Sequence, residues 1–127
     1  MLDEIVAQAR DEAPNECCGL VGTRDGRAVT LFKARNARAS PFAYEIDSRD
    51  LLHAYNAIDD AGLDVGIIYH SHTRRDAGAS QTDINLAKFP GAVYLIVGVQ
   101  DPDDAEIAAW HIRDGQVSEA PLEVEEG

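Results

Sequence analysis

The sequence predicts a mixed α/β (α+β) fold, in which one β-sheet holds both parallel and antiparallel strands and is flanked by helices. Helical and strand-like patterns alternate along most of the 127-residue chain. An Asp-Gly pair separates two strand-like segments near each end of the chain, and such pairs are typical of tight β-hairpins. Hairpins at both ends favour a mixed sheet with helices on its faces over a doubly wound parallel sheet.

The first part of the chain is expected to form a helix followed by a hairpin. Pro14 ends the helical pattern. The apolar residues that recur at helical spacing before it are Leu2, Ile5, Val6, Ala9 and Ala13. Residues 17–23 read as a strand, residues 28–34 read as its partner, and Asp25-Gly26 forms the turn between them.

The middle of the chain is expected to hold a loop, a short strand and a second helix. The loop covers residues 36–41 and the strand covers residues 42–46. Asp47 or Ser48 caps the helix, which ends near Gly62 because glycine suits the turn after a helix. The apolar residues of this helix are Leu51, Leu52, Tyr55 and Ile58.

The second half of the chain begins with the clearest strand signal. A short, apolar and β-branched run over residues 65–69 is typical of a buried strand. A loop with Gly78 then reverses the chain, and Ser80 begins a third helical pattern that Pro90 stops. The remaining elements are strands over residues 92–99 and 107–112, with a hairpin turn at Asp114-Gly115 leading into Val117. The acidic tail over residues 123–127 is expected to fray.

Composition and charge limit the possible functions. Acidic residues number 23 against 11 basic ones, so the net charge is −12 at pH 7. Such a surface argues against nucleic acid and membranes as partners, and no apolar run approaches the roughly 20 residues of a membrane helix. A basic partner, a salt-rich habitat or solubility would explain the acidity, and solubility is the simplest. The length suits one domain over residues 1–127, and an acidic start without a signal segment predicts a cytoplasmic protein.

The two cysteines predict no covalent cross-link. Cys17 and Cys18 are adjacent, and neighbouring residues do not readily adopt disulfide geometry. The absence of a disulfide framework fits a reducing compartment. The pair also lacks the C-x-x-C spacing of a zinc site. We expect both residues to be small hydrophobic side chains of a strand.

The strongest functional signal is the motif His70-Ser71-His72, followed after a short loop by Asp83. Side chains two apart on a strand share a face, so both imidazoles can point at one ion. Asp83 lies in the first turn of the third helix, whose N-terminus favours a carboxylate. Two imidazoles and one carboxylate form a typical catalytic zinc set, because three protein ligands leave the fourth tetrahedral position open for water.

Each half of this motif also has a purely structural interpretation. An H-x-H pair in a strand can arise by chance, and Ser80-x-x-Asp83 is a helix capping pattern. Capping and metal binding are compatible, because a carboxylate has two oxygens. His53, with polar neighbours in a helix, and His111, with no second ligand near it in its strand, are interpreted as structural or surface residues.

The motif resembles the signature of the JAMM (MPN+) metalloproteases, in which H-S-H is followed by S-x-x-D. The resemblance spans nearly the whole chain and is closest to short prokaryotic members that trim ubiquitin-like sulfur-carrier proteins. The further segments that resemble the family are Asn15–Gly22, Asn36, Ser40-Pro41, Tyr44–Asp47 and Trp110–Gly115. The resemblance implies a JAMM/MPN fold, which is similar to the cytidine-deaminase-like architecture.

The resemblance also implies a mechanism. One Zn2+ ion per chain would be bound by His70, His72 and Asp83. Glu16 would be the general base that takes a proton from the zinc-bound water, and Ser80 would hydrogen-bond the developing oxyanion or the water. The reaction would be peptide or isopeptide hydrolysis after the C-terminal Gly-Gly of a ubiquitin-like (sulfur-carrier) protein. The oligomeric state stays open, and a homodimer is one option.

The choice of Glu16 depends on the resemblance, because this residue lies far upstream of the motif. From the residues alone, Asp76 in the loop would be the local choice for the base. The chain departs from the family at Thr73 and Ala79, where proline is common. Neither residue is a ligand, so the departures bear on loop shape and substrate fit.

Two other functions compete with that of a peptidase. A non-enzymatic MPN-type binding or scaffold module would have lost metal ligands, and this chain keeps all of them. A zinc deaminase requires H-x-E together with P-C-x-x-C, whereas here the residue two after His70 is His72. The helix-borne H-E-x-x-H of other metalloproteases is also missing from the sequence.

Overall fold

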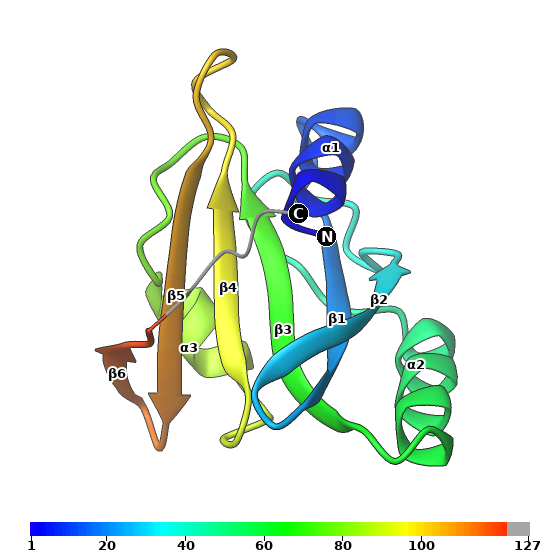
Figure 1. Ribbon diagram of the computed structural model, residues 1–127. Coiled ribbons are helices and arrows are strands. Elements are labelled where there is room, and N and C mark those ends of the chain that lie inside the picture. The colour runs from blue at the N-terminus through cyan, green and yellow to red at the C-terminus, as the bar shows by residue number, and fades with distance from the viewer. Residues whose placement is uncertain (122–127) are drawn as a thin grey trace.

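The computed structural model describes residues 1–121, and a six-stranded β-sheet forms its centre (Figure 1). The elements follow one another as α1 (Leu2–Glu12), β1 (Cys18–Arg24), β2 (Arg27–Ala34), α2 (Ser48–Asp60), β3 (Asp64–His72), α3 (Gln81–Leu86), β4 (Val93–Gly98), β5 (Glu106–Arg113) and β6 (Gln116–Glu119). In space the strands are ordered β2-β1-β3-β4-β5-β6. The acidic tail over residues 123–127, for which the sequence predicts fraying, lies outside the described residues.

The sheet is mixed, which confirms the prediction. β3 and β4 run parallel, and every other neighbouring pair is antiparallel. A parallel pair needs a crossover connection, and the chain between these two strands supplies one that contains α3. Both predicted hairpins are present, and φ is positive at Asp25 and Gly26 (52° and 78°) and at Asp114 and Gly115 (50° and 76°). Tight hairpin turns require positive φ at both central positions, which explains the two Asp-Gly pairs.

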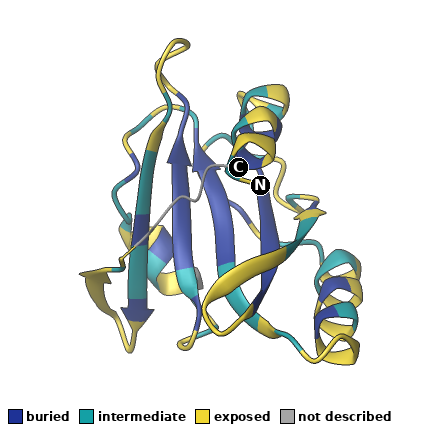
Figure 2. Cartoon of the chain, in the orientation of Figure 1, coloured by how far each residue is buried: buried dark blue, intermediate teal, exposed yellow. Residues whose placement is uncertain are grey.

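Alternate residues of the central strand β3 face opposite layers of the molecule. Ile67 and Tyr69 belong to the apolar cluster that packs against α1, whereas Ile68 belongs to the cluster that packs against α2 and α3. Figure 1 shows α1 and α3 on opposite faces of the sheet. His70 and His72 continue the alternation of Ile68, so both side chains fall on the α2 and α3 face. Figure 2 shows that the end of β3 that carries them is buried.

The N-terminal elements agree with the sequence predictions to within two residues. In α1, Ile5 and Ala9 are buried. Cys17 and Cys18 are both free thiols and both buried, as expected of small residues at the start of a central strand. No helix within residues 1–121 is long and apolar enough to cross a membrane.

The predicted strand over residues 42–46 is wrong. These residues form a loop whose strand-like pairing is limited to one bridge, between Asn36 and Ile46. Instead of a ladder, the side chain of Asn36 supplies the hydrogen bonds. Its Nδ2 donates to the carbonyl oxygens of Ala43 and Glu16, both at 3.0 Å, and its Oδ1 accepts from two backbone amides of the loop. One polar side chain thus fastens the loop to the segment that carries Glu16.

The second helix begins and ends where the sequence predicts. Asp47 is its N-cap and accepts hydrogen bonds from two amides of the first turn, and Gly62 follows its end with φ of 69°. The apolar residues are only partly buried. Ile58 is 2% exposed, whereas Leu52 and Tyr55 are 61% and 49% exposed. The helix lies at the edge of the sheet (Figure 1), so these two apolar side chains face away from the core.

The third helix is shorter than its sequence pattern. Ser80 caps it as predicted, but the helix covers only six residues. Ala87 already has an extended conformation, with ψ of 114°, although the pattern continues as far as Pro90. The short helix nevertheless keeps its first turn, which is the part that faces the end of β3.

Candidate metal centre

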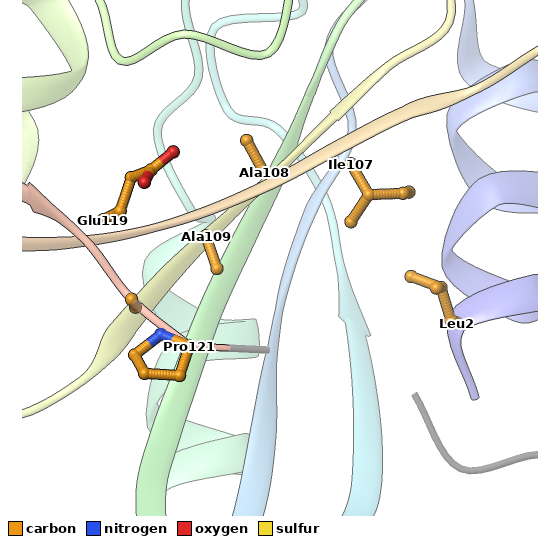
Figure 3. Close-up of a pocket in the computed structure, with 7 residues that line it drawn as sticks. Leu2, Ile107, Ala108, Ala109, Glu119 and Pro121 are labelled. Carbon is orange, nitrogen blue, oxygen red and sulfur yellow. The ribbon is translucent and has the colours of Figure 1, made fainter. Parts of the chain in front are cut away.

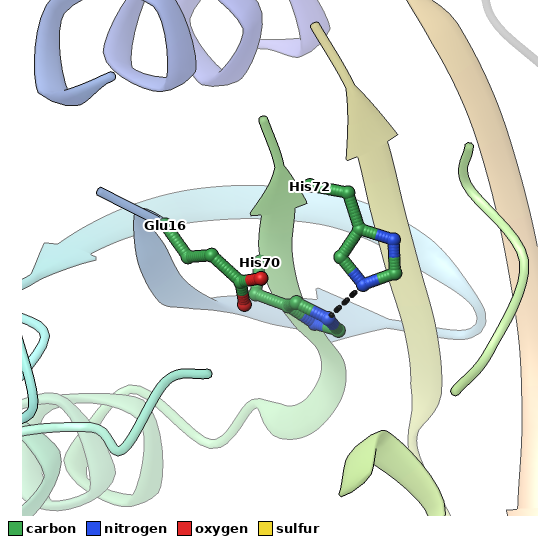
Figure 4. A group of neighbouring side chains, drawn as sticks. All are labelled: Glu16, His70 and His72. Atoms are coloured by element: carbon green, nitrogen blue, oxygen red, sulfur yellow. Dashed lines mark hydrogen bonds between the residues drawn. The ribbon is translucent and has the colours of Figure 1, made fainter. Parts of the chain in front are cut away.

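Two histidines at the end of β3 turn the same ring nitrogen to a common point. The Nε2 atoms of His70 and His72 are 3.1 Å apart, and the two residues are 1% and 0% exposed. The ring of Tyr44 stacks on His70 with a centroid distance of 4.2 Å. The Nδ1 atom of His72 meets the carbonyl oxygen of Asp76. These contacts fix the orientation of both rings. Figure 4 shows how the two rings face each other.

Asp83 reaches the same point from the first turn of α3. Its Oδ1 lies 3.0 Å from Nε2 of His70, and its Oδ2 lies 3.0 Å from Nε2 of His72. The Oγ of Ser80 accepts from the Asp83 amide at 3.1 Å, and the Ser80 amide donates to Oδ2 of Asp83 at 2.9 Å. The predicted capping box is therefore present, and it directs the carboxylate toward the imidazoles.

Burial and hydrogen bonding set the protonation of these groups. Burial lowers the pKa of His70 in spite of the nearby carboxylate, so the ring is neutral near pH 7. Burial also acts to raise the pKa of Asp83. The close contacts with His70, His72 and the Ser80 amide outweigh that effect and hold the pKa of Asp83 well below its usual range. A neutral imidazole and an ionised carboxylate are the forms that bind a metal.

The hydrogen-bonding capacity of these side chains fits a cation at their common point. A carbonyl oxygen only accepts, so we assign the proton of the His72 ring to Nδ1, where it meets Asp76. In a neutral ring Nε2 then carries a lone pair, which faces a carboxylate oxygen of Asp83 at 3.0 Å. Tetrahedral zinc, with bonds of about 2.0–2.1 Å, places its ligand atoms about 3.3 Å apart. The separations of 3.0–3.1 Å among the three side chains come close to that value, so zinc suits this set.

Glu16, two residues before the start of β1, brings a second carboxylate to the same place (Figure 4). It is 0% exposed, and its carboxylate and the ring nitrogens of His70 and His72 offer ligand atoms within 4.8 Å of one another. Its Oε2 accepts a hydrogen bond from Arg75 at 3.1 Å, whereas its Oε1 is buried without a hydrogen-bond partner. Burial raises the pKa of Glu16 to about 7, although His72 and Arg75 both act to lower it.

Four side chains therefore converge where three ligands suffice, and we call His70, His72, Asp83 and Glu16 the candidate centre. The two oxygens of Asp83 bridge the imidazoles at 3.0 Å. Glu16 is instead engaged by the guanidinium of Arg75. This arrangement suits Asp83 as the third ligand and Glu16 as a neighbouring acid or base, because a carboxyl group with a pKa near neutrality can take up and return a proton.

The other two residues that the sequence singles out are placed differently. Ser80 is the N-cap of α3, and its hydroxyl accepts a hydrogen bond there, so the hydroxyl proton can still be donated. Asp76 is exposed, and its carboxylate accepts from the Gly78 amide at 3.0 Å. Its carbonyl oxygen, and not its carboxylate, contacts His72. The local choice for the base is thus an exposed residue, whereas Glu16 is buried within the candidate centre.

Cross-strand pairing explains how Glu16 meets residues so far along the chain. β1 and β3 pair with Cys18 opposite His70. The pairing extends one step beyond β1, where the Cys17 amide donates to Oγ of Ser71 at 2.8 Å and the Ser71 amide donates to the Cys17 carbonyl at 3.1 Å. Glu16, the next residue back, therefore comes to lie beside the end of β3.

Arg75 and Ser71 have roles that the sequence analysis does not predict. Arg75 pairs with Glu16 and lies 3.9 Å from Oδ1 of Asp83. A charged residue in a loop gives no sign of such a contact, because most loop arginines are solvated. Ser71 contacts Cys17 because of the register between β1 and β3. That register is known only from the structure, so the sequence gives no sign of this contact.

The remaining histidines lie outside the candidate centre, in agreement with the sequence interpretation. His53 is exposed on α2, and His111 lies on β5 opposite Ser118 of β6. Neither belongs to the close group of possible metal-binding side chains that Glu16, His70 and His72 form.

Two surface pockets also lie away from the candidate centre. Figure 3 shows the first, between the start of α1 and the strand β5, with Leu2, Ile107 and Pro121 among its lining residues. Glu119 is the ionisable residue in that lining. The second pocket lies on the same face, along the first residues of α1 and the start of β4. Neither lining includes a residue of the candidate centre, so the chemistry is located by the converging side chains and not by a cavity.

Comparisons with known proteins find similar sequences along most of the chain. The sequence model of the family described as prokaryotic homologs of the JAB domain matches residues 1–113. The chain is 38% identical to the CysO-cysteine peptidase of Mycobacterium tuberculosis over 99% of this chain and 88% of that protein. It is 42% identical to the desampylase of Haloferax volcanii over 74% of this chain and 73% of that protein.

A solved structure confirms the fold. The solution structure of a protein from Desulfitobacterium hafniense matches with a TM-score of 0.87 and 30% sequence identity. The match covers 99% of this chain and 89% of that chain. The mixed sheet flanked by helices is therefore shared with a protein whose structure was determined by experiment.

Proposed function

We propose that this chain, which belongs to the family of prokaryotic homologs of the JAB domain and is a peptidase of that family, uses zinc to cleave a ubiquitin-like protein directly after its C-terminal Gly-Gly. The observation that carries the proposal is the triangle of His70, His72 and Asp83. The facing atoms of these side chains lie 3.0–3.1 Å apart, beside the fully buried carboxylate of Glu16.

We assign one zinc ion per chain to His70, His72 and Asp83. Bound there, zinc would polarise a carbonyl group and lower the pKa of a bound water to about 7. The protein holds the ligands for this task with further contacts. The Asp76 carbonyl fixes the ring of His72, and the Ser80 amide fixes the carboxylate of Asp83. Such partners of the ligands commonly set ligand orientation and metal affinity.

Glu16 is the general base in this proposal. Its Oε1 has no hydrogen-bond partner, so it can accept a proton from the attacking water. Glu16 then gives that proton to the leaving nitrogen as the amide C–N bond breaks. The second proton of the water passes from the new carboxyl group to the same nitrogen. One product therefore ends in a carboxylate at Gly-Gly and the other carries an ammonium group, which accounts for the oxygen and both protons of the water.

Ser80 is the proposed donor to the oxyanion that develops on the scissile carbonyl. Its hydroxyl accepts from the Asp83 amide and keeps its own proton for another acceptor. A donor fixed in place before the reaction stabilises developing charge without reorganisation, and such donors commonly contribute a large share of the rate.

The substrate class is supported by the relatives and by the chemistry of glycine. The relatives at 38% and 42% identity are named CysO-cysteine peptidase and desampylase, and a further relative in Thermus thermophilus is named a probable TtuB-protein conjugate cleaving protease. An extended tail can pair with backbone next to a strand end, as in strand addition. Two glycines let that tail approach the candidate centre without a side-chain clash.

The proposed function is tested with ubiquitin-like proteins from the same genome, each extended beyond Gly-Gly and incubated with the zinc-loaded protein. We expect mass measurement of the products to give a cut directly after the second glycine. Replacing either glycine by leucine should remove most of the rate. Equal cleavage of tails ending in Leu-Leu would contradict the substrate class, and no cleavage of any carrier would contradict the proposed function as a whole.

Three broader expectations accompany this proposal. The chain forms one domain over residues 1–127, and the family match covers residues 1–113 of it. The cytoplasm remains the expected compartment, on the sequence grounds given above. The acidic surface, with a net charge of −12, suits a carrier with a basic patch, whose docking salt should weaken.

A further inference from the structure

Arg75, in the loop between β3 and α3, contacts both carboxylates of the candidate centre. Its Nη2 donates to Oε2 of Glu16 at 3.1 Å and lies 3.9 Å from Oδ1 of Asp83. Both Nη atoms also reach the carbonyl oxygen of Phe42 at 3.4 Å. Its Nε has no hydrogen-bond partner, and 33% of the side chain is exposed. The guanidinium therefore lies at the rim of the candidate centre with unused hydrogen-bonding capacity.

Charge balance gives Arg75 a task beyond its pairing with Glu16. Glu16 and Asp83 contribute two carboxylates to the candidate centre, and Arg75 adds one positive charge beside them. A divalent cation on the proposed ligands would balance the two carboxylates and leave the charge of the guanidinium unmatched. A local surplus of positive charge, in a chain whose net charge is −12, favours an anionic group on the substrate.

Building on the proposed function, we propose that Arg75 binds the α-carboxylate of the residue that leaves. The substrate would then be a ubiquitin-like tail that ends in Gly-Gly plus a single residue with a free C-terminus. Guanidinium groups bind carboxylates through paired N–H donors, which makes arginine suited to this task.

The distances allow this contact. Glu16 returns its proton to the leaving nitrogen, and in an amino acid the α-carboxylate carbon is two covalent bonds from that nitrogen, a span of about 2.5 Å. Nη2 of Arg75 is 3.1 Å from the carboxylate of Glu16. A leaving residue that receives its proton from Glu16 therefore has its carboxylate within reach of Arg75.

A substrate with a lysine isopeptide bond would offer no carboxylate to the positive charge of Arg75. Its leaving nitrogen is an ε-amino group at the end of an aliphatic chain, with no carboxylate two bonds away. A peptide bond inside a longer chain is no better, because the corresponding carbonyl belongs to an uncharged amide. The position of Arg75 thus favours removal of one C-terminal residue over separation of two joined proteins.

A second role for Arg75, the orientation of Glu16, predicts a different pattern of kinetics. Loss of the guanidinium slows turnover in either case, so the rate on one substrate does not distinguish the two roles. A carboxylate contact is present in the bound substrate and acts mainly on KM, and only for substrates with a free C-terminus. Disorientation of the base lowers kcat for every substrate.

The test compares two substrates and four proteins. The substrates are one ubiquitin-like protein that ends in Gly-Gly-Ala, prepared with a free carboxylate and with a C-terminal amide. The proteins are the wild type, Arg75→Gln, Arg75→Lys and the matched control Arg74→Gln. Arg74 carries the same charge on the adjacent residue, but it lies over the Phe42 ring, with 5.4 Å from its guanidinium carbon to the ring centroid.

We expect kcat/KM of the wild type and of Arg74→Gln to be about 10- to 100-fold higher for the acid than for the amide, the usual effect of a charged hydrogen-bonded pair. Most of the difference should lie in KM. In Arg75→Gln the ratio should fall close to one, and Arg75→Lys should restore part of it, because lysine keeps the charge without the paired donors.

Peptide binding gives a readout that does not need turnover. Calorimetry compares two peptides that end in Gly-Gly-Ala, one with a free C-terminal carboxylate and one with a C-terminal amide. In both peptides a non-hydrolysable ketomethylene group replaces the peptide bond between the second glycine and the alanine. The zinc-loaded wild type should bind the acid about 10-fold more tightly, and Arg75→Gln should bind both alike.

The outcomes separate this inference from the proposed function. Equal cleavage and equal affinity for acid and amide, or a preference that persists in Arg75→Gln, would overturn the role of Arg75 while cleavage after Gly-Gly still supports the function. If neither substrate is cleaved but the acid peptide binds more tightly through Arg75, the carboxylate site stands and the proposed function fails. Absence of both cleavage and preference contradicts both.

Discussion

The two faces of β3 treat buried polar side chains in opposite ways. On the α1 face, the hydroxyl of Tyr69 donates to Oε1 of Gln8. Nε2 of Gln8 in turn donates to Glu12 at 3.0 Å and to the carbonyl oxygen of Cys18 at 3.1 Å. Tyr69, Gln8 and Glu12 are therefore linked by hydrogen bonds.

On the other face, one residue further along, the polar groups converge and leave several of their atoms without a hydrogen-bond partner. Within residues 1–121, five buried side-chain nitrogen or oxygen atoms lack a hydrogen-bond partner. Four of them belong to the candidate centre and its arginine, namely Glu16 Oε1, His70 Nδ1, Arg75 Nε and Asp83 Oδ1. The same strand thus carries a closed network on one side and an open set of donors and acceptors on the other.

The difference teaches how to separate structural from functional burial. A buried polar group without a partner costs about 1–3 kcal/mol, so a fold rarely collects several of them in one place. Such a collection is tolerated where a metal, water or substrate supplies the missing partners. The paired groups on the α1 face stabilise the fold. The unpartnered groups on the α3 face lower its stability and are free to bind a metal, water or substrate.

The largest effect should follow from removing a ligand on the open face. His72→Ala should abolish zinc binding and reduce hydrolysis to background, because it deletes one corner of the His70, His72 and Asp83 triangle. Metal analysis of both purified proteins, with circular dichroism to check the fold, measures this. Equal zinc content in the two proteins would exclude the assignment. Zinc should also dissociate at acid pH, since a protonated imidazole is not a ligand.

The next largest effect should separate metal binding from proton transfer. Glu16→Gln keeps the shape of the side chain and removes its basicity, so zinc content should stay full. Turnover should fall by at least about 10²-fold, the usual contribution of a general base. Near-normal turnover with full zinc would return the role of base to Asp76 or to another carboxylate.

The same substitution should sharpen the comparison through stability in the zinc-free protein. The pKa of Glu16 is raised from 4.5 to about 7 by burial, so the folded state holds the proton more strongly than the unfolded chain does. The stability of the wild type should therefore decrease as pH rises from 4.5 to 7 and level off above that.

Glu16→Gln has no proton to lose, so it should gain about 2–3 kcal/mol relative to the wild type across this range. Urea unfolding in the presence of a chelator, at several pH values, measures the difference. A constant difference between the two proteins at all pH values would mean that Glu16 does not titrate in this range.

The smallest effect should come from the closed face. Tyr69→Phe leaves Oε1 of Gln8 without its donor and should cost about 1–2 kcal/mol in the free energy of unfolding. Zinc content and turnover should not change. Tyr55→Phe is the matched control, because Tyr55 is 49% exposed and its hydroxyl can be replaced at little cost. A loss of turnover in Tyr69→Phe at full zinc content would show that the two faces are coupled.

The convergence of His70, His72 and Asp83 could be predicted from the sequence because its geometry is local. A strand repeats every two residues, so His70 and His72 share a face wherever the strand lies. A capping box fixes the first turn of a helix, so Ser80 orients Asp83 by short-range contacts alone. The resemblance to a known family added a role for each residue but was not needed to group the ligands.

Glu16 and Arg75 could not be chosen in this way, because their positions depend on pairing between distant segments. Glu16 is placed by the register of β1 against β3. Arg75 is placed by hydrogen bonds to Glu16 and to the carbonyl of Phe42. No local pattern records either contact, and only the family resemblance pointed to Glu16.

The errors in the predicted fold have a related origin. Residues 42–46 contain strand-forming side chains, but the side chain of Asn36 pairs with the backbone of this segment and leaves it a loop. In α2, apolar spacing places Leu52 and Tyr55 on a core face, yet the helix lies at the edge of the sheet and exposes both. Propensity describes which secondary structure a segment prefers. Its neighbours in the fold decide whether that structure forms and which side chains it buries.

Two sequence separations, one between His72 and Asp83 and one between Cys17 and Ser71, bear on the order in which the candidate centre can assemble. His72 and Asp83 are 11 residues apart, so the ligands come together when one short loop closes. The hydrogen bonds that place Glu16 join Cys17 to Ser71, which are 54 residues apart, and closing that longer loop costs more conformational entropy. A partly folded chain with β3 and α3 formed would therefore contain the three proposed metal ligands but lack Glu16, the proposed base. In the proposed mechanism, hydrolysis therefore requires a chain whose β1 and β3 are already paired.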